Sequence, residues 1–461
     1  MTRSFPMVTV YLVNHNYGQY LHQAITSVLN QTFQDYELII IDNGSSDDSK
    51  GIIESFAMHE KIRVVFQENI GLNATNNVAI SMSIGRYVMR LDADDYLDEH
   101  ALEIMAGKLE RDTNIDLVFP DYYLVDVEGN IIELMRRHDF SEVKLLDQPA
   151  HGACTMVRRD CLIALDGYDE LYHCQDGWDL WVKFIQKYGV ANVNLPLFYY
   201  RQHNNNLSGN EERLLATRAK ILKKNANNSR GATNCIAIVP IRGGGVDSFS
   251  FALEQLGDKS LIDWTLDEAL LAEHISRVVV TSPDEKVCQH VRDKYAGKVE
   301  IVKRDWKLAL PNMSLDATLT TLFNEIPDEW RIFDAMALLF IESPFRTAKY
   351  IDMAIDAMEI FQTNRVISVR RQRSVFYRHS GEGVEPLNVS TLLRQEKDEL
   401  FQEAGGIDVI RRGALYRDIP NDKKIGHIDL DEMSALHISS EWTWKIAQIY
   451  AASLLEKNRL N

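Results

Sequence analysis

The sequence lacks paired cysteines, a long apolar run and an excess of positive charge. Its cysteines show no CxxC pair or regular spacing, which predicts free thiols in a reducing compartment; they are Cys154, Cys161, Cys174, Cys235 and Cys288. The longest apolar run, near residues 335–341, is too short to span a bilayer. The formal net charge of −17 argues against a nucleic-acid partner. We therefore expect a cytoplasmic protein without a transmembrane segment, with peripheral association at the inner face of the membrane as an alternative.

The chain of 461 residues is long enough for two or three domains, and its composition, 45% hydrophobic and 25% charged, is typical of soluble globular proteins. The stretch "MVTVYLVN" is predicted to be a first strand, because its apolar part is too short for a signal peptide. Strand-like runs then alternate with helix-like runs, and the alternation starts again at "CIAIVPI". The segment between the two series, "NANNSRGATN", is rich in Asn, Ser and Gly. We expect an α/β fold with a domain at 1–224, a linker at 225–234 and a second domain at 235–461.

Polar clusters follow several strands of the first series. They occupy residues 14–16, 42–47 and 92–95. Continuously apolar strands separated by helices predict a parallel sheet covered on both faces, and such sheets bind ligands at the carboxyl ends of their strands. The sequence therefore predicts a ligand site where these clusters meet. A nucleotide diphosphate bound there needs local cations, because the protein is strongly acidic.

The stretch "RLDADDYLD" places Asp92, Asp94 and Asp95 at one strand end. Three carboxylates this close repel one another unless a cation joins them, which favours a divalent metal site. The alternative is a solvated turn or a helix cap, and an isolated DxD motif has that role in most proteins.

Three stretches within residues 8–213 resemble the family-2 inverting glycosyltransferases of GT-A fold: "VNHNYGQYLHQAITSVLNQTFQDYELIIIDNGSSDDS", "ENIGLNATNNVAI" and "GRYVMRLDADDYLDEHAL". The resemblance implies a donor nucleotide bound by Asn14, Asn16, Asp42, Asn69, Asn76 and Asp92. Asp42 would contact the base, Asp92 the ribose, and Asp94 would ligate Mg²⁺ or Mn²⁺. The family often has Arg at the position of Asn76, so this chain must supply that charge from elsewhere.

Two further stretches resemble the acceptor side and the closing segment of the same family. In "HCQDGWDLWVKF", Asp176 is the first choice for the catalytic base, and Asp179 is the runner-up one helical turn later. The alternative for Asp179 is a structural ion pair or cap. In "FYYRQHNNNLS", the resemblance implies that His203 completes the metal shell or touches the diphosphate. Arg201 would clamp a phosphate, and Asp95 would face phosphate or acceptor.

The second half resembles the cytidylyltransferases that make CMP-activated acid sugars, through "IAIVPIRGGG", "LFIESPFRTAKYIDMAIDAM" and "LHISSEWTWKIAQ". The loop after Arg242 lacks the Lys and Arg that grip CTP in that family, and "LHISSEW" has His437 and Ser439 where the family has carboxylates. We therefore expect a second Rossmann-like domain without nucleotidyl transfer. A remaining ligand pocket is predicted from Arg242, Ser343 and Arg346, with Arg370, Arg371 and Arg373 either joining it or forming a solvated strand end.

Three functional hypotheses follow. The first is a metal-dependent glycosyltransferase of bacterial surface-polysaccharide biosynthesis that moves a sugar from a nucleotide-sugar donor to a glycan or lipid-linked acceptor. In it, the C-terminal domain serves binding or homo-oligomerisation. The second is a bifunctional enzyme that also makes a CMP-activated acid sugar from CTP. The third is a non-catalytic scaffold. The DxD motif disfavours the third, and the missing loop cations disfavour the second, so the first is our prediction.

Overall fold

The computed structural model describes residues 5–460 except 137–145, 148, 151, 204–210, 230–232, 245–250, 311, 326–331, 373, 382, 388–399 and 415–423. The side chains of residues 176, 227–229, 324 and 457–460 are also outside the description. The chain divides into two compact units. The first comprises Met1–Arg218 and Val375–Asp398, and the second comprises Ala219–Ser374 and Glu399–Asn461.

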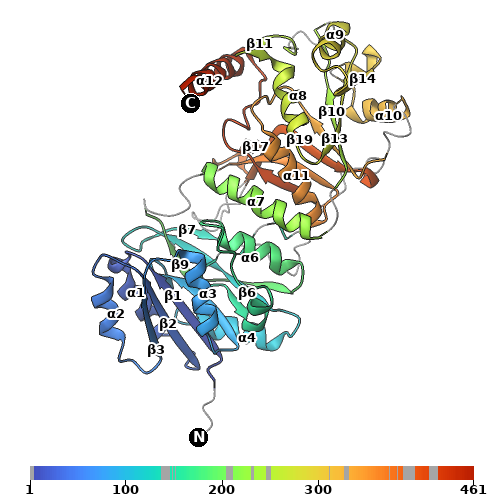
Figure 1. Ribbon diagram of the computed structural model, residues 1–461. Helices are drawn as coiled ribbons and strands as arrows, with labels where there is room; N and C mark the ends of the chain where they lie inside the picture. Colours follow the sequence, from blue (N-terminus) through green and yellow to red (C-terminus); the bar gives the residue numbers. More distant parts are fainter. Residues whose placement is uncertain are drawn as a thin grey trace. The chain divides into compact units, whose positions relative to one another are not determined.

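The first unit begins with four parallel strands in the order β3-β2-β1-β4 (Figure 1). Their bounds are β1 Val8–Asn14, β2 Tyr36–Asn43, β3 Ile62–Gln67 and β4 Tyr87–Asp92. The connecting helices are α1 Gly18–Leu29, α2 Ser49–Phe56 and α3 Leu72–Met82. Strands β1 and β2 are buried along their whole length, which explains their unbroken apolar runs.

Beyond β4 the sheet becomes mixed, with the order β4-β8-β6-β9-β5 and with β7 paired to β6. The strands are β5 Tyr96–Leu97, β6 Leu117–Val125, β7 Ile131–Met135, β8 Met156–Arg158 and β9 Val190–Arg201. The helices are α4 Ala101–Arg111, α5 Arg159–Ala164 and α6 Asp176–Ile185. One apolar core joins α1, α2 and α4 to one face of the sheet, and a second joins α3, α5 and α6 to the other face. The expected α/β domain is thus confirmed as a mixed sheet between two helical layers.

The second unit has a separate sheet in the order β14-β13-β10-β15-β19-β16-β20. Its strands are β10 Cys235–Pro240, β13 Ile275–Ser282, β14 Val299–Lys303, β15 Ala335–Leu339, β16 Arg365–Gln372, β19 Leu400–Arg411 and β20 Ile425–Asp429. Its helices are α8 Leu261–Leu271, α9 Glu285–Lys294, α10 Leu315–Glu325, α11 Ala348–Phe361 and α12 Glu441–Leu460. The short strands β11 Gln255–Leu256 and β12 Lys259–Ser260 form a hairpin. Strands β14, β13, β10 and β15 are parallel, as the second strand–helix alternation predicted, whereas β19 runs antiparallel to β15 and β16.

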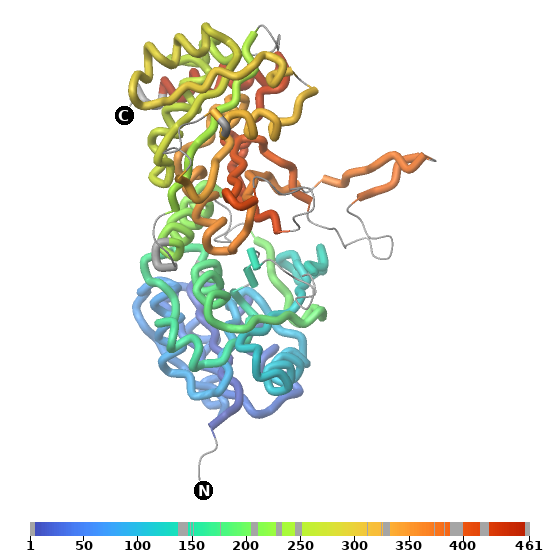
Figure 2. The backbone as a smooth tube through the Cα atoms, turned by 90° about the vertical axis from the view of Figure 1, so that its right-hand side faces the viewer, coloured from blue at the N-terminus to red at the C-terminus, as the bar shows by residue number. Residues whose placement is uncertain are grey.

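Helix α7, Glu211–Ser229, occupies the start of the predicted linker. The first five positions of that linker, 225–229, are therefore helical, and residues 230–232 lie outside the description. A further hairpin of β17 Tyr377–His379 and β18 Val384–Pro386 is a narrow two-stranded projection (Figure 2). The sequence did not predict this hairpin, because its strands are only three residues long.

Asp263 anchors the start of α8 in the second unit. Its carboxylate accepts hydrogen bonds from the backbone N–H and the hydroxyl of Ser260 and from Tyr295 Oη at 3.0 Å. The bond from the Ser260 N–H and the reciprocal bond from the Asp263 N–H to the Ser260 side chain form a capping box. His290 Nε2 and Lys294 Nζ lie 2.9 and 3.0 Å from its carboxylate. Burial acts to raise the pKa of Asp263, but the bonds from Ser260, His290 and Lys294 outweigh it and lower the pKa to about 2.

We expect Asp263→Asn to lower the free energy of unfolding at pH 7 by about 2 kcal/mol, the linkage value of a carboxyl pKa lowered to about 2. A lowered folded-state pKa stabilises the protein above the unfolded pKa, and this stabilisation is lost as the pH falls from about 4 to about 2. Urea unfolding at several pH values measures both effects. The exposed Asp258→Asn is the control, and equal acid sensitivity of wild type and Asp263→Asn in that window would contradict the assignment.

Candidate active site

The ends of β1 and β2 form the first part of the site. Asn14 lies opposite Asp42 in the parallel register, and both side chains are buried. Asn14 Nδ2 donates to Asp42 Oδ1 at 2.8 Å and to Ser45 Oγ at 3.0 Å. The Ser45 N–H and hydroxyl both donate back to Asp42. The predicted base-binding carboxylate is therefore held rigidly at the strand end.

Asn16 joins the two loops at this edge. Its backbone is in the left-handed region, with φ 61°, which Asn tolerates better than most residues. Its N–H donates to Ser45 Oγ at 2.9 Å, and its Oδ1 accepts from Ser46 N at 2.7 Å. These bonds indicate that Asn16 shapes the loop, while its predicted nucleotide contact stays a prediction.

Asn69 lies against the loop that follows β2. Its Oδ1 accepts from Asn43 Nδ2 at 3.1 Å and from Gly71 N at 3.0 Å. Gly44 has φ +74°, and a Cβ added there would lie 2.8 Å from the backbone nitrogen of Asn69. Only glycine fits this turn without moving backbone.

We expect Gly44→Ala to destabilise the protein by about 1–2 kcal/mol, because the added Cβ combines φ strain with a backbone clash. It should also raise the KM for the donor, because Asn69 and the loop after Asp42 must shift. Thermal unfolding and steady-state kinetics measure the two effects. Gly51→Ala is the matched control, since it lies in α2 with open space around its Cα and should not weaken donor binding. Equal donor KM values for both variants would show that the turn does not serve the site.

Asn76 lies on α3, where the family resemblance often places Arg. Its side chain is fully buried, and neither amide atom has a hydrogen-bond partner among the described residues. A buried unpaired amide is costly. Asn76 therefore brings no positive charge to the site.

The aspartate loop after β4 is the second part of the site. Asp92 lies partly exposed at the strand end, with Val13 of β1 as its register partner, and Arg90 Nε donates to its Oδ1 at 2.6 Å. Asp94 and Asp95 follow in the turn, and Asp95 is 1% exposed. The three predicted carboxylates and the Asn14–Asp42 pair thus occupy the carboxyl ends of adjacent strands.

The pKa values show strong mutual repulsion in this loop. Burial, and then the Asp92 carboxylate, raise the pKa of Asp94, against the lowering effect of His203. Burial, Asp94 and Asp92 raise the pKa of Asp95 well above its usual range. Burial and the same three carboxylates raise the pKa of Tyr17 to about 12. A bound cation would relieve this negative potential.

His203 lies beside Asp94, while its predicted role in the metal shell or at the diphosphate stays a prediction. Its Nε2 lies 2.9 Å from Asp94 Oδ2, and both side chains are largely buried. The imidazole lies beside the rings of Tyr17 and Tyr20, with centroid distances of 5.5 and 5.7 Å. The two tyrosines were not predicted as site residues. Only their position between the polar end of β1 and α1 could have indicated them.

Arg201 and Asp95 are both buried and bonded to each other. Arg201 is 2% exposed, and its Nε donates to the backbone oxygen of Asp94 at 2.9 Å. Its Nη groups donate to Asp126 O, Val127 O and Gln23 Oε1. Asp95 Oδ1 accepts from the Arg201 N–H at 2.9 Å. These bonds indicate that both residues hold the aspartate loop, while their predicted contacts with phosphate or acceptor stay a prediction.

Helix α6 carries the predicted base. Asp176 is its first residue, and the position of its side chain lies outside the described part. Asp179 is 1% exposed, and its Oδ2 lies 2.5 Å from Lys183 Nζ. This buried ion pair favours the structural alternative for Asp179.

In the second unit, the predicted pocket residue Arg242 lines a cavity. A cavity of about 380 Å³ at the ends of β10 and β15 is bordered by Arg242, Arg304, Glu342, His437 and Ser439, among others. Ser343 and Arg346 are fully buried next to it. The Arg346 Nη1 group donates to Phe340 O and Ser343 O, and Ser343 Oγ lies 3.4 Å from His437 Nδ1. Ser343 and Arg346 therefore support the cavity wall.

Arg304 was missed by the sequence analysis, because it follows a strand without any motif. It is 7% exposed and donates to Thr318 Oγ1 and Ile241 O. Burial and the nearby Arg242 lower the pKa of Arg304 to about 10. Of the other arginines, Arg371 pairs with Asp429, Arg370 donates to Leu430 O, and Arg373 lies outside the described residues.

No group of three or more His, Cys, Asp or Glu side chains able to hold a metal occurs among the described residues. Within the same residues, no helix combines the length and the apolar character that a membrane-spanning helix needs. The free cysteines are confirmed, and all five are buried.

The first unit is thus an α/β domain with a polar edge at the carboxyl ends of β1, β2 and β4. Residues 9–165 match the sequence profile of the family described as "Glycosyl transferase family 2". This match agrees with the resemblance to family 2 glycosyltransferases that the motifs predicted.

Three relatives are named as synthases or glycosyltransferases. The chain is 34% identical to a chondroitin synthase of Escherichia coli over 128 residues, which are 28% of this chain and 19% of that protein. It is 31% identical to an uncharacterized glycosyltransferase of Methanocaldococcus jannaschii over 190 residues, 39% of this chain and 65% of that protein. It is 25% identical to a hyaluronan synthase of Pasteurella multocida over 205 residues, 44% of this chain and 21% of that protein. The chain thus spans less than two thirds of the length of these relatives.

Among solved structures, the chain is similar to S. aureus TarS in complex with UDP-GlcNAc. The sequence identity is 18% and the TM-score 0.42, over 48% of this chain and 66% of that chain.

Proposed function

We propose that the first unit is an inverting glycosyltransferase that moves a sugar from a nucleotide-sugar donor to a hydroxyl group of a glycan or lipid-linked acceptor. The observation that carries this proposal is the meeting of the Asn14–Asp42 pair with the Asp92–Asp95 loop at one sheet edge. This edge lies within the residues that match the family. The relatives named chondroitin and hyaluronan synthase support a polysaccharide product.

The donor is proposed to bind along this edge. Asp42 is held by Asn14 and Ser45 and is positioned to accept from the base, while Asp92 accepts from the ribose. Asp94 and His203 are the residues that would hold Mg²⁺ or Mn²⁺. Their oxygen and nitrogen donors fit such a cation, and two protein ligands suit a metal whose other ligands are substrate phosphates. When bound, the metal neutralises the departing diphosphate.

The acceptor reacts at the side of α6. We propose that Asp176 takes the proton of the acceptor hydroxyl, so that the oxygen displaces the nucleotide diphosphate with inversion at the anomeric carbon. Asp179 is the runner-up, although its pair with Lys183 suits a structural role. The proposed setting is bacterial surface-polysaccharide or capsule assembly in the cytoplasm, at the inner face of the membrane.

The second unit is proposed to be a cytidylyltransferase-like accessory domain, for ligand binding or homo-oligomerisation. Two arginines in one cavity at the carboxyl edge of its sheet favour an anionic ligand there. Two alternatives are distinguished by the experiment described next. In the first, this unit makes a CMP-activated sugar from CTP. In the second, the protein is a non-catalytic scaffold.

The proposal is tested by a thermal-shift and turnover screen of UDP-, GDP-, dTDP- and CMP-sugars, together with free CTP, with Mn²⁺ and with Mg²⁺. We expect one donor class to raise the Tm and to release its nucleotide diphosphate only with metal. Pyrophosphate release from CTP would establish the bifunctional enzyme. If no donor raises the Tm and none is turned over, the non-catalytic scaffold is the remaining hypothesis.

A further inference from the structure

Arg90 is a buried cation two residues before Asp92 on β4. Residues at i and i+2 of a strand point to the same face of the sheet, so Arg90 and Asp92 lie on the face that α3, α5 and α6 cover. Arg90 is 7% exposed, and Asp92 is 26% exposed. The Arg90 side chain is therefore buried inside the domain, while the Asp92 carboxylate is partly exposed at the carboxyl end of β4.

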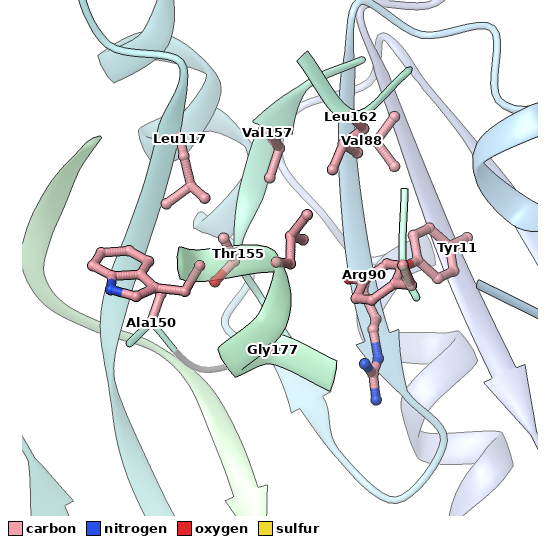
Figure 3. Close-up of a pocket in the computed structure, with 13 residues that line it drawn as sticks. Tyr11, Val88, Arg90, Leu117, Ala150, Thr155, Val157, Leu162 and Gly177 are labelled. Atoms are coloured by element: carbon pink, nitrogen blue, oxygen red, sulfur yellow. The ribbon is translucent and has the colours of Figure 1, made fainter. Parts of the chain in front are cut away.

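The surroundings of Arg90 are largely apolar. It lines a small cavity of about 30 Å³ with Val88, Leu117 and Trp181. Figure 3 shows Arg90 with Tyr11, its register partner on β1, to one side and the first turn of α6, at Gly177, to the other. A charged group in such a place is costly unless it is paired. The pairing with Asp92 therefore stabilises this arrangement.

The contact also fixes the orientation of Asp92. Arg90 Nε donates to Oδ1 at 2.6 Å, a charge-assisted hydrogen bond. Among the described residues, Oδ2 of Asp92 accepts no hydrogen bond. Asp92 shares its loop with two further carboxylates, Asp94 and Asp95. Arg90 is the ion-pair partner that the structure gives to Asp92.

We propose that Arg90 is a positioning residue of the donor site. It holds Oδ1 of Asp92 through the hydrogen bond from its Nε, so that Oδ2 is turned toward the donor, where it accepts from a ribose hydroxyl. In this way Arg90 provides from β4 a positive charge that the neutral Asn76 does not provide from α3. The inference rests on the proposed function, and it adds a residue that determines selectivity for the sugar of the nucleotide.

The test compares the donor that wild type uses with its 2′-deoxy and 3′-deoxy analogues. We expect Arg90→Gln to raise the KM for the ribonucleotide donor about 10- to 100-fold, the range of one hydrogen bond to a charged group. The KM for the deoxy analogue that lacks the contacted hydroxyl should change little. The preference for ribose should therefore collapse, while kcat changes much less than KM. Arg90→Lys should restore part of the preference, because it keeps the charge.

Arg158→Gln is the matched control. Arg158 lies on β8 of the same sheet and also forms a partly buried ion pair, with Asp116 at 3.1 Å. Arg158→Gln should lower the Tm without changing the preference for ribose. If Arg90→Gln raises the KM for every analogue by the same factor, or leaves all of them unchanged, the proposal is overturned. If wild type turns over no donor at all, the proposed function itself has failed, and this outcome is distinct from the other two.

Discussion

Asp94→Asn is expected to lower kcat/KM for the donor about 1,000-fold, because it removes the charge that would hold the cation on the departing diphosphate. The substitution keeps the size of the side chain. Burial and Asp92 raise the pKa of Asp94, so a neutral side chain should be tolerated there, and the Tm should stay the same or rise. The measurement is nucleotide diphosphate release at saturating Mn²⁺, with a metal titration of both proteins.

The control for Asp94→Asn is Asp160→Asn, an exposed aspartate in the first turn of α5 in the same unit. It should keep the wild-type rate and metal dependence. A folded Asp94→Asn protein that turns over donor at the wild-type rate would show that this carboxylate does not hold the metal.

Asp176→Asn and Asp179→Asn are expected to have opposite signatures. Loss of a general base typically lowers the rate about 10²- to 10⁴-fold, so Asp176→Asn should lower kcat by that factor with little change in Tm. Asp179→Asn breaks the buried pair with Lys183 and should cost roughly 3 kcal/mol of stability while much of the activity is retained. Single-turnover kinetics and urea unfolding of both variants separate the two roles.

Lys183→Met provides the control for that comparison, because it breaks the same ion pair from the other side. It should lower stability about as much as Asp179→Asn does. If Asp179→Asn instead abolishes turnover while Lys183→Met remains active, Asp179 is the catalytic base and the assignment of Asp176 is wrong.

Much of the first unit could be predicted from the sequence, because buried parallel strands leave unbroken apolar runs. The ends of these strands then located the site: Asn14, Asp42 and Asp92 lie at adjacent strand ends in the structure, as predicted. The mixed part of the sheet was harder to predict. Strand β8 has three residues and β5 has two, which is too short for a periodic pattern.

Side-chain roles could be predicted less well than positions. Arg201 and Asp95 have the residue types of a phosphate site, yet both are buried. Their hydrogen bonds depend on Gln23 and the loop at 126–127, which are distant in sequence. In the sequence, Arg90 lies within a largely apolar strand. Its ion pair with Asp92 is seen only in the structure, where the Arg90 side chain is buried and that of Asp92 is partly exposed. In the second unit, Arg304 joins Arg242 at a cavity through tertiary packing that no motif encodes.

The most direct test of the account is the rate at which wild type releases nucleotide diphosphate from its donor before and after removal of metal by EDTA. We predict that EDTA abolishes release by the wild type, that Mn²⁺ or Mg²⁺ restores it, and that neither metal restores release by Asp94→Asn. Release at the same rate with and without EDTA would contradict a metal-dependent transfer at the edge formed by Asp42, Asp92 and Asp94.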